Sequence, residues 1–324
     1  MRIFARLIMK TMTFACLFVL IFPLSSGAEE LTEASWQELT DDTSRATLFE
    51  DEIVPARLAE NEKLTSDPTI SLNIPKEFWF PDDAKFDKVL NKPRDKTVFG
   101  VDISHHNGKV SFKNFRLQHI SFVYMKATQG VRFKDGKFGT YWSDIAALEE
   151  TSRLYRGAYH FLSANGSAED QANSFVDYIT LHGGLKPGDL PPCLDLEWDR
   201  TSTNPDQWRG QDADAILTKT LKWLKIVEDR TGRKPILYTA RSWWRERIKD
   251  EKALARFDGY HVWIADYSTS HKAAEKPAII NGKEQKLWQF TDNALMATGY
   301  NRGIDANIYY GTADTFEADF GIAQ

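Results

Sequence analysis

From residue 97 onward, short apolar runs alternate with longer segments of helical period. This pattern restricts the possible folds more than any other feature of the sequence. Helical patterns follow each of the first five runs, near residues 111–117, 141–152, 168–181, 212–230 and 242–257. No such pattern separates the last three runs. Short apolar runs that alternate with helices indicate βα units rather than a sandwich. We therefore expect an α/β barrel that closes with strands alone, from eight strands at residues 98–103, 120–127, 155–161, 192–196, 235–238, 261–265, 286–290 and 304–309.

Four acids stand at or near the ends of these expected strands. Asp102 ends the first run, Asp195 and Glu197 end the fourth, and Asp305 lies near the eighth. In barrels built from βα units, functional groups gather at the carboxyl ends of the strands. If the first, fourth and eighth strands converge at one end of the barrel, these four acids meet there.

Asp195 and Glu197 form the sharpest local signal for catalysis. Residues two apart on a strand point to the same face, with backbones roughly 6 to 7 Å apart. Adjacent carboxylates repel when both are ionised, which drives one toward the protonated form that a general acid needs. A D-x-E triplet also occurs by chance at solvated strand ends. The apolar strand before it, Trp198 after it and the two other acids favour the catalytic interpretation.

The charge of the chain is unevenly distributed. Residues 29–96 hold 17 acids and 9 bases, whereas residues 97–324 hold 29 of each. The C-terminal body is therefore neutral and lacks the basic excess of a nucleic-acid binder, so no nucleic-acid partner is expected. A hydrophobic content of 42% over 324 residues is ample for one large core.

The first 28 residues have the layout of a secretory signal peptide, with three cations, no acid and an apolar run at 12–23. Cleavage after Ala28 would make the protein exported, periplasmic or extracellular. An uncleaved membrane anchor is the alternative, although the run is short for a transmembrane helix. Cys16 would leave with the signal. Cys193 would then remain alone and unable to form an internal disulfide.

Residues 29–96 are predicted to be an acidic, partly ordered N-terminal extension, and residues 97–324 to be the catalytic barrel. The extension shows no sustained hydrophobic period. The aromatic stretch from Phe78 to Pro81 differs from the rest of the extension. We expect it to dock on the barrel, because exposed aromatic clusters are unfavourable, while a partner-binding motif is the alternative.

The body resembles glycoside hydrolase family 25, the Chalaropsis-type lysozymes or N-acetylmuramidases, across about residues 97–312. The family's fold is a TIM-like (β/α)5β3 barrel, which agrees with the strand and helix pattern. Seven matching stretches occur in family order: GVDIS at 100–104, KATQG at 126–130, GAYHF at 157–161, LDLE at 194–197, LYT at 237–239, WQF at 288–290 and GIDAN at 303–307.

The resemblance implies roles for the four acids. Glu197 corresponds to the general acid, Asp195 to its partner carboxylate, and Asp102 and Asp305 to supporting acids. The implied reaction is hydrolysis of the β-1,4 bond between N-acetylmuramic acid and N-acetylglucosamine in peptidoglycan glycan strands. The chain departs from the family at Gln129, where an acid is common, so any role of that position is in doubt.

Three aromatic residues fall where similar proteins line the sugar groove. They are Tyr159, Tyr238 and Trp288, and Gln289 beside Trp288 is taken with them as substrate-binding. Aromatic faces suit the apolar patches of pyranose rings, although core packing explains such residues equally well.

Two other enzyme classes are disfavoured by spacing. A chitinase with the D-x-x-D-x-D-x-E run needs two further Asp residues before Asp195, but Cys193 and Leu190 stand there. A metal site could recruit His105, His106 and His160, yet no metal-ligand spacing such as H-x-x-x-H is present. No metal and no cofactor are therefore expected.

The main alternative from another class is a peptidoglycan-binding protein that has lost turnover. Such a protein would usually have lost one of the acids, and all four are present. An enzyme acting on another N-acetylated glycan such as chitin is a further alternative. We expect an exported monomeric muramidase, with no membrane contact beyond the signal segment.

Overall fold

The computed structural model describes residues 80–87, 92–94, 96–150, 153–201, 204–267 and 285–322. Within these residues eight strands form a closed barrel, because β3 pairs with both β4 and β11. In the barrel, β3, β4 and β6 to β10 run parallel, and β11 is antiparallel to both its neighbours. They are β3 (Thr97–Ile103), β4 (Ile120–Gln129), β6 (Tyr155–Phe161), β7 (Cys193–Leu196), β8 (Ile236–Ala240), β9 (His261–Ala265), β10 (Leu287–Ala294) and β11 (Ile304–Tyr310).

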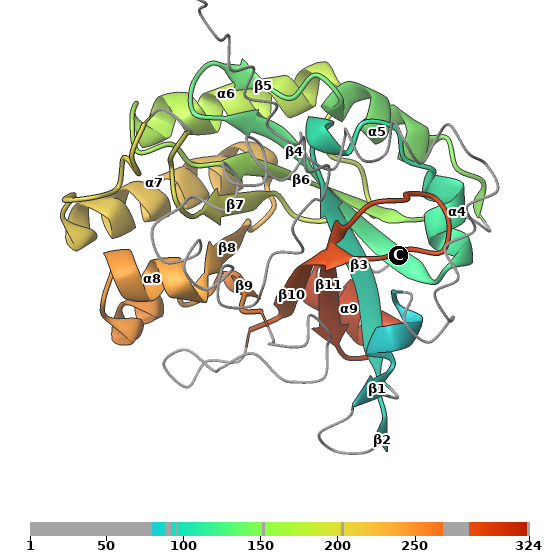
Figure 1. Cartoon of the computed structure of the whole chain (residues 1–324). Helices are drawn as coiled ribbons and strands as arrows, with labels where there is room; N and C mark the ends of the chain where they lie inside the picture. Colours follow the sequence, from blue (N-terminus) through green and yellow to red (C-terminus); the bar gives the residue numbers. More distant parts are fainter. Residues whose placement is uncertain are drawn as a thin grey trace, which may run out of the picture. The chain divides into compact units, whose positions relative to one another are not determined.

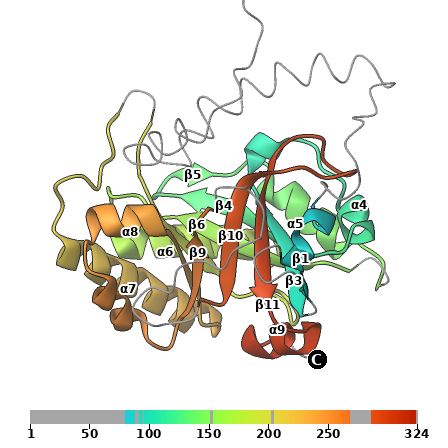
Figure 2. The ribbon, with the colours of Figure 1, turned by 60° about the horizontal axis from the view of Figure 1, so that its bottom comes forward.

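Helices surround the strands, and one follows each of the first five (Figure 1). The bounds are α4 (Phe112–Leu117), α5 (Phe138–Ala146), α6 (Ala168–Leu181), α7 (Ala213–Thr231) and α8 (Arg241–Arg247), with the 3-10 helix η6 (Glu251–Phe257) after α8. The predicted α/β barrel of eight strands is confirmed. The segment between β9 and β10, residues 268–284, lies outside the described residues. Figure 2 shows β10, β11 and β3 side by side, with α9 (Ala313–Asp319) below them.

Helix ends are set by local side chains. Ser167 accepts a hydrogen bond from Asp170 N at the start of α6, and Asp212 accepts one from Ala215 N at the start of α7. Both satisfy backbone donors that the first helical turn leaves unpaired. Gly232 ends α7 in the left-handed conformation, which glycine adopts without steric penalty.

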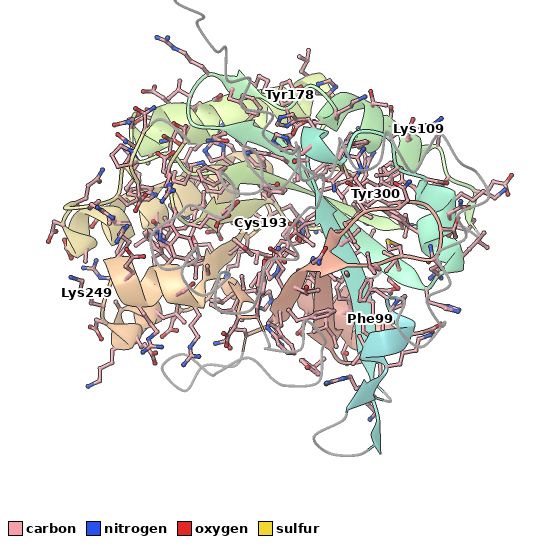
Figure 3. The ribbon with its side chains drawn as sticks, viewed as in Figure 1. Phe99, Lys109, Tyr178, Cys193, Lys249 and Tyr300 are labelled. Carbon is pink, nitrogen blue, oxygen red and sulfur yellow. The ribbon has the colours of Figure 1, made fainter. Side chains whose placement is uncertain are left out.

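The barrel interior is filled by large rings, and two glycines make room for them. A Cβ on Gly157 would lie 2.2 Å from the ring of Tyr124, and one on Gly100 would lie 2.3 Å from that of Phe122. Cys193, at the start of β7, is a buried free thiol in this packed interior (Figure 3). The aromatic packing explains why glycine is needed at both strand positions.

Several short elements were not predicted because they are too short to show a periodic pattern. The strand β5 (Phe133–Lys134) pairs antiparallel with the end of β4. Two more strands, β1 (Phe86–Asp87) and β2 (Lys92–Pro93), pair with each other after the 3-10 helix η3 (Asp82–Ala84). A further 3-10 helix, η4 (His105–Asn107), follows β3.

Phe80 anchors the chain that precedes the barrel. Its side chain is 1% exposed and packs against the rings of Phe99 and Phe290, at 5.6 and 5.7 Å between centroids. Its backbone N–H donates to the carbonyl of Leu295 at 2.7 Å. The predicted docking is confirmed for Phe80. Phe78, Trp79 and the predicted signal peptide lie outside the described residues.

A search of the described ranges finds no helix with the length and apolar character needed to cross a bilayer.

Candidate active site

The strand register brings two of the candidate acids directly together. Asp102 on β3 lies opposite Asp305, the second residue of the antiparallel strand β11. Both therefore sit at the end of the barrel where β3 to β10 finish, which we call the barrel mouth. Asp195 on β7 and Glu197 just after it lie at the same end. Asp102, Asp195 and Glu197 are 8%, 7% and 5% exposed, and Asp305 is partly exposed.

Tyr159 on β6 lies close enough to several acids for their charges to affect its phenol. Burial raises the pKa of its phenol well above the ordinary value, and the charges of Asp102, Asp195, Asp135 and Asp305 raise it further. The strand register agrees with this, because Tyr159 is the partner of Cys193 on β7, two residues before Asp195. Tyr159 therefore lies at the same end of the barrel as Asp195, Asp102 and Asp305.

Gln289 on β10 holds Asp102 in place. Its Nε2 donates to Oδ2 of Asp102 at 2.9 Å. Its Oε1 accepts hydrogen bonds from the hydroxyls of Tyr238 and Tyr267, at 2.9 and 3.0 Å. Since a carbonyl oxygen must face the donors, the tyrosines turn the amide so that its N–H points at the carboxylate. Tyr238 and Gln289, two predicted substrate-binding residues, therefore belong to one network.

Asn307 on β11 completes the support of Asp102. Its Nδ2 donates to Asp102 Oδ2 at 2.7 Å, and its Oδ1 accepts from Trp263 Nε1 at 2.9 Å. Asn307 is fully buried, and no role was predicted for it. Its position in the GIDAN stretch, two residues after Asp305, was the sequence signal that could have indicated a role for it. Two amide donors thus hold the same carboxylate oxygen of Asp102 in a fixed position.

The turn after β7, which carries Glu197, is fixed by its neighbours. Trp198 is buried, and its Nε1 donates to Glu246 Oε2 at 2.8 Å. The carboxylate of Asp199 accepts from Ser163 Oγ and Ala164 N, both at 2.7 Å. These contacts tie the turn to α8 and to the loop after β6. The Glu197 backbone is thus held from both sides.

Trp288 lies on the opposite face of β10 from Gln289. It is 2% exposed, its ring stacks on Tyr310, and its Nε1 donates to the carbonyl of Asp266 at 2.5 Å. No ring face is open to solvent in this arrangement. The predicted contact of Trp288 with sugar stays a prediction, and what the structure shows is packing.

The three histidines considered for a metal site do not share one place. His160 points away from the barrel interior and stacks on Trp223 of α7, at 5.3 Å between centroids. Its ring nitrogens contact Thr128 Oγ1 at 2.6 Å and Gln171 Oε1 at 3.2 Å. Burial lowers its pKa to about 3, so the ring is neutral at physiological pH.

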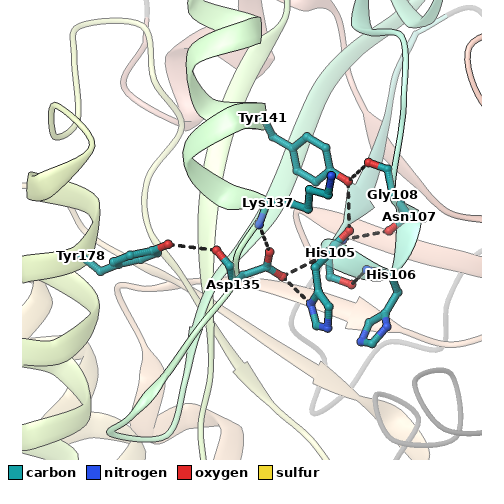
Figure 4. Close-up of polar contacts among 9 residues, drawn as sticks. His105, His106, Asn107, Gly108, Asp135, Lys137, Tyr141 and Tyr178 are labelled. Atoms are coloured by element: carbon teal, nitrogen blue, oxygen red, sulfur yellow. Dashed lines mark hydrogen bonds and ion pairs between the residues drawn. The ribbon is translucent and has the colours of Figure 1, made fainter.

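His105 is instead paired with Asp135, an acid that sequence reasoning missed (Figure 4). The backbone N–H of His105 donates to Asp135 Oδ2 at 2.8 Å, and its Nδ1 lies 2.8 Å from the same oxygen. Burial alone would raise the pKa of Asp135, but the bonds from His105 and Lys137 outweigh it and lower the pKa. The ring of His106 lies against that of His105, at 3.7 Å between centroids and tilted by 43°. Among the described residues, no group of three or more His, Cys, Asp or Glu side chains is arranged to hold a metal.

Comparison with known proteins identifies the family of the chain. The sequence model described as Glycosyl hydrolases family 25 matches residues 101–298. The chain is 31% identical to an N,O-diacetylmuramidase of Chalaropsis sp over 221 residues, covering 65% of this chain and 96% of the relative. It is 26% identical to lysozyme M1 of Streptomyces globisporus over 220 residues, or 67% and 69% of the two chains.

A solved muramidase from Trichobolus zukalii shares the fold, with a TM-score of 0.55 and 29% identity over 69% of this chain and 98% of that one. The family match spans β3 to β10 and so includes Asp102, Asp195 and Glu197. The chain therefore belongs to glycosyl hydrolases family 25 and is a glycoside hydrolase.

Proposed function

We propose that the chain is a muramidase that hydrolyses the β-1,4 bond between N-acetylmuramic acid and N-acetylglucosamine in bacterial peptidoglycan. One observation carries the proposal: four acids stand at the barrel mouth, with Asp102 opposite Asp305 on β3 and β11, and Asp195 and Glu197 buried at the end of β7. Similarity to a muramidase and a lysozyme supports the choice of substrate.

Glu197 acts as the general acid in this proposal. A buried carboxyl group close to other carboxylates favours its protonated form, which can donate to the glycosidic oxygen. The bond between C1 and that oxygen breaks, and the proton leaves with the departing sugar. Glu197, now ionised, then takes a proton from the water that completes hydrolysis.

Asp195 is assigned to the 2-acetamido group of the substrate. In glycosidases acting on N-acetyl sugars, the amide oxygen can attack C1 and form a cyclic cation, which water later opens. A neighbouring carboxylate orients the amide and stabilises the positive charge. Asp195 suits this role because it precedes the acid by two residues and is buried at the same barrel end.

Asp102 and Asp305 supply negative charge to the positively charged transition state. Asp102 is held by Gln289 and Asn307, so its carboxylate is fixed before substrate binds. Tyr159 and Tyr238 stand beside these acids as candidate sugar contacts. Trp288 remains a less favoured candidate, because its ring is packed away from solvent.

The finer architecture and location are also proposals. We assign a (β/α)5β3 barrel to residues 97–324, preceded by a signal peptide at 1–28 and an acidic extension at 29–96. The protein would be exported to the periplasm or outside the cell and act there as a monomer. Related wall-lytic enzymes support this location.

The test is mass spectrometry of purified peptidoglycan after digestion. Wild-type protein should release fragments with N-acetylmuramic acid at the reducing end. Glu197→Gln should lower turnover by about 10²- to 10⁴-fold and still bind wall. Glu169→Gln, on the exposed face of α6, is the matched control and should be fully active.

Three outcomes would redirect the proposal. Near-normal turnover by Glu197→Gln would remove Glu197 from the mechanism. Wall binding without any cleavage by wild-type protein would indicate a non-catalytic binding protein. Cleavage of chitin but not of wall would indicate another N-acetylated substrate.

A further inference from the structure

A groove of about 610 Å³ lies between the loops that follow β4 and β6 at the barrel mouth. One wall is the turn from β4 to β5, residues 129–133, and the other comprises residues 163, 165 and 166 after β6. Two apolar side chains of the first wall, Val131 and Phe133, are 39% and 40% exposed. Adjacent exposed apolar side chains in a concave surface are typical of binding sites.

The second wall is held rigid by side chains from two helices. The ammonium of Lys219 on α7 donates to three backbone carbonyls of residues 163–166, at 2.7 to 2.8 Å. The amide of Gln171 on α6 makes three bonds to the backbone of the same segment, at 2.8 to 3.0 Å. On the first wall, Ser174 Oγ donates to the carbonyl of Val131 at 2.7 Å. The groove is therefore formed before any ligand arrives.

The groove lies within a short reach of the candidate catalytic acids. Gln129, which lines it, is the register partner of Phe161 on β6, and Phe161 is the partner of Asp195 on β7. Neighbouring strands are about 4.8 Å apart, so Gln129 and Asp195 are separated by about 10 Å at the backbone. A substituent on a sugar held at the acids can enter the groove.

Charged side chains border the groove, and the carboxylate of Asp199 behind the second wall is bonded to Ser163 and Ala164. Arg132 is the charged residue among those lining the groove, and its side chain forms no ion pair or hydrogen bond within the described ranges. Lys126 Nζ lies 5.6 Å from the ring centroid of Phe133, and the His105 ring lies 5.5 Å from it. The nearby acid Asp135 is buried and bonded to His105. An exposed cation above an apolar floor fits an anionic, partly apolar ligand.

We propose that this groove binds the short peptide carried by muramic acid in peptidoglycan. A carboxylate of the peptide pairs with Arg132, and its apolar side chains lie on Val131 and Phe133. An extended peptide spans about 3.3 to 3.6 Å per residue, so about three residues cover the 10 Å from the acids. The inference rests on the proposed function, because it names the part of the same substrate that selects it.

The test compares Arg132→Met with Lys234→Met on two substrates. Lys234 is exposed and precedes β8, at the opposite end of the barrel, so it controls for loss of one positive charge. The substrates are peptide-bearing glycan strands and strands stripped of peptide by an amidase, which keep the lactyl carboxylate of muramic acid. Arg132→Met should lower kcat/KM about five- to ten-fold on peptide-bearing strands and leave stripped strands unchanged. Lys234→Met should change neither.

An equal loss on both substrates would overturn the inference and assign Arg132 to the lactyl carboxylate or the sugar. A binding measurement separates this inference from the proposed reaction. If wild-type protein cuts no strand, muramidase function fails, but titration with a soluble disaccharide-peptide from wall still tests the groove. Weaker binding by Arg132→Met than by Lys234→Met supports the peptide site, and equal binding refutes it.

Discussion

Asn307→Ala tests the network that holds Asp102, because Asn307 is fully buried and uses both ends of its amide. The substitution removes a hydrogen bond to a carboxylate, which contributes about 1.5 to 3 kcal/mol, and leaves the buried indole N–H of Trp263 without its acceptor, at about 1 to 3 kcal/mol. Gln289 still donates to Asp102, so the total should lie near the middle of the range. We expect a loss of about 4 kcal/mol in the free energy of unfolding.

The assay is thermal and urea unfolding, combined with wall digestion. For a barrel of this size a loss of about 4 kcal/mol lowers Tm by about 10 °C. Asn114→Ala is the control, because Asn114 donates to Thr298 Oγ1 at the surface, and its loss should stay within about 0.5 kcal/mol. Activity at a temperature where Asn307→Ala is folded should also fall. A loss of stability below about 1 kcal/mol would refute the assigned network.

Three further predictions follow from single contacts. Wall glycan with N-deacetylated muramic acid should be cut far more slowly than acetylated glycan, because Asp195 then has no amide to orient, and equal rates would make Asp195 a nucleophile or base. Phe80→Ala should lower the free energy of unfolding in urea by about 3 kcal/mol, since Phe80 is buried against the barrel, and an unchanged midpoint would contradict this. Because the pKa of His160 is held at about 3, the unfolded chain binds a proton below pH 6.5 that the native chain does not. The free energy of unfolding should therefore fall by about 2 kcal/mol between pH 6.5 and pH 5 because of this residue. His160→Gln should remove this fall, and an unchanged fall in the variant would show that His160 is not its cause.

Most of the fold was predictable where a regular period coincides with a boundary signal. The helix predicted at 168–181 matches α6, whose first turn is capped by Ser167, and the strand predicted at 155–161 matches β6. The helix predicted at 141–152 was misplaced, because α5 runs from Phe138 to Ala146. Lys137 at its start provides no side-chain cap, so the sequence contains no start signal there.

One helix was predicted without its interruption, and another was not predicted at all. The single helix predicted at 242–257 is α8 followed by η6, and Lys249 between them has a φ of 63° that no helix continues through. The helix α9 was missed because its seven residues are too few for a periodic signal. Side-chain periodicity does not reveal a break in backbone geometry such as that at Lys249, nor a helix of two turns such as α9.

The candidate acids were found from strand ends, but their partners were not. Asp102 and Asp305 were expected to converge, and β3 and β11 place them opposite each other only because the barrel closes. The bond from Asn307 to Asp102 joins residues 205 apart, and the pair of His105 with Asp135 joins residues 30 apart. Neither spacing repeats in the sequence, so only the closed sheet reveals these pairs.

The buried thiol of Cys193 can report the rate at which the barrel opens. Burial, together with the negative charges of Asp195 and Asp102, raises the thiol pKa, so the reactive thiolate is scarce in the native state. A thiol reagent reaches Cys193 only when the strands separate. The rate of labelling in plain buffer thus measures how often the barrel opens, without denaturant or mutation. The same shielding keeps two copies of the chain from cross-linking through Cys193 in an oxidising compartment.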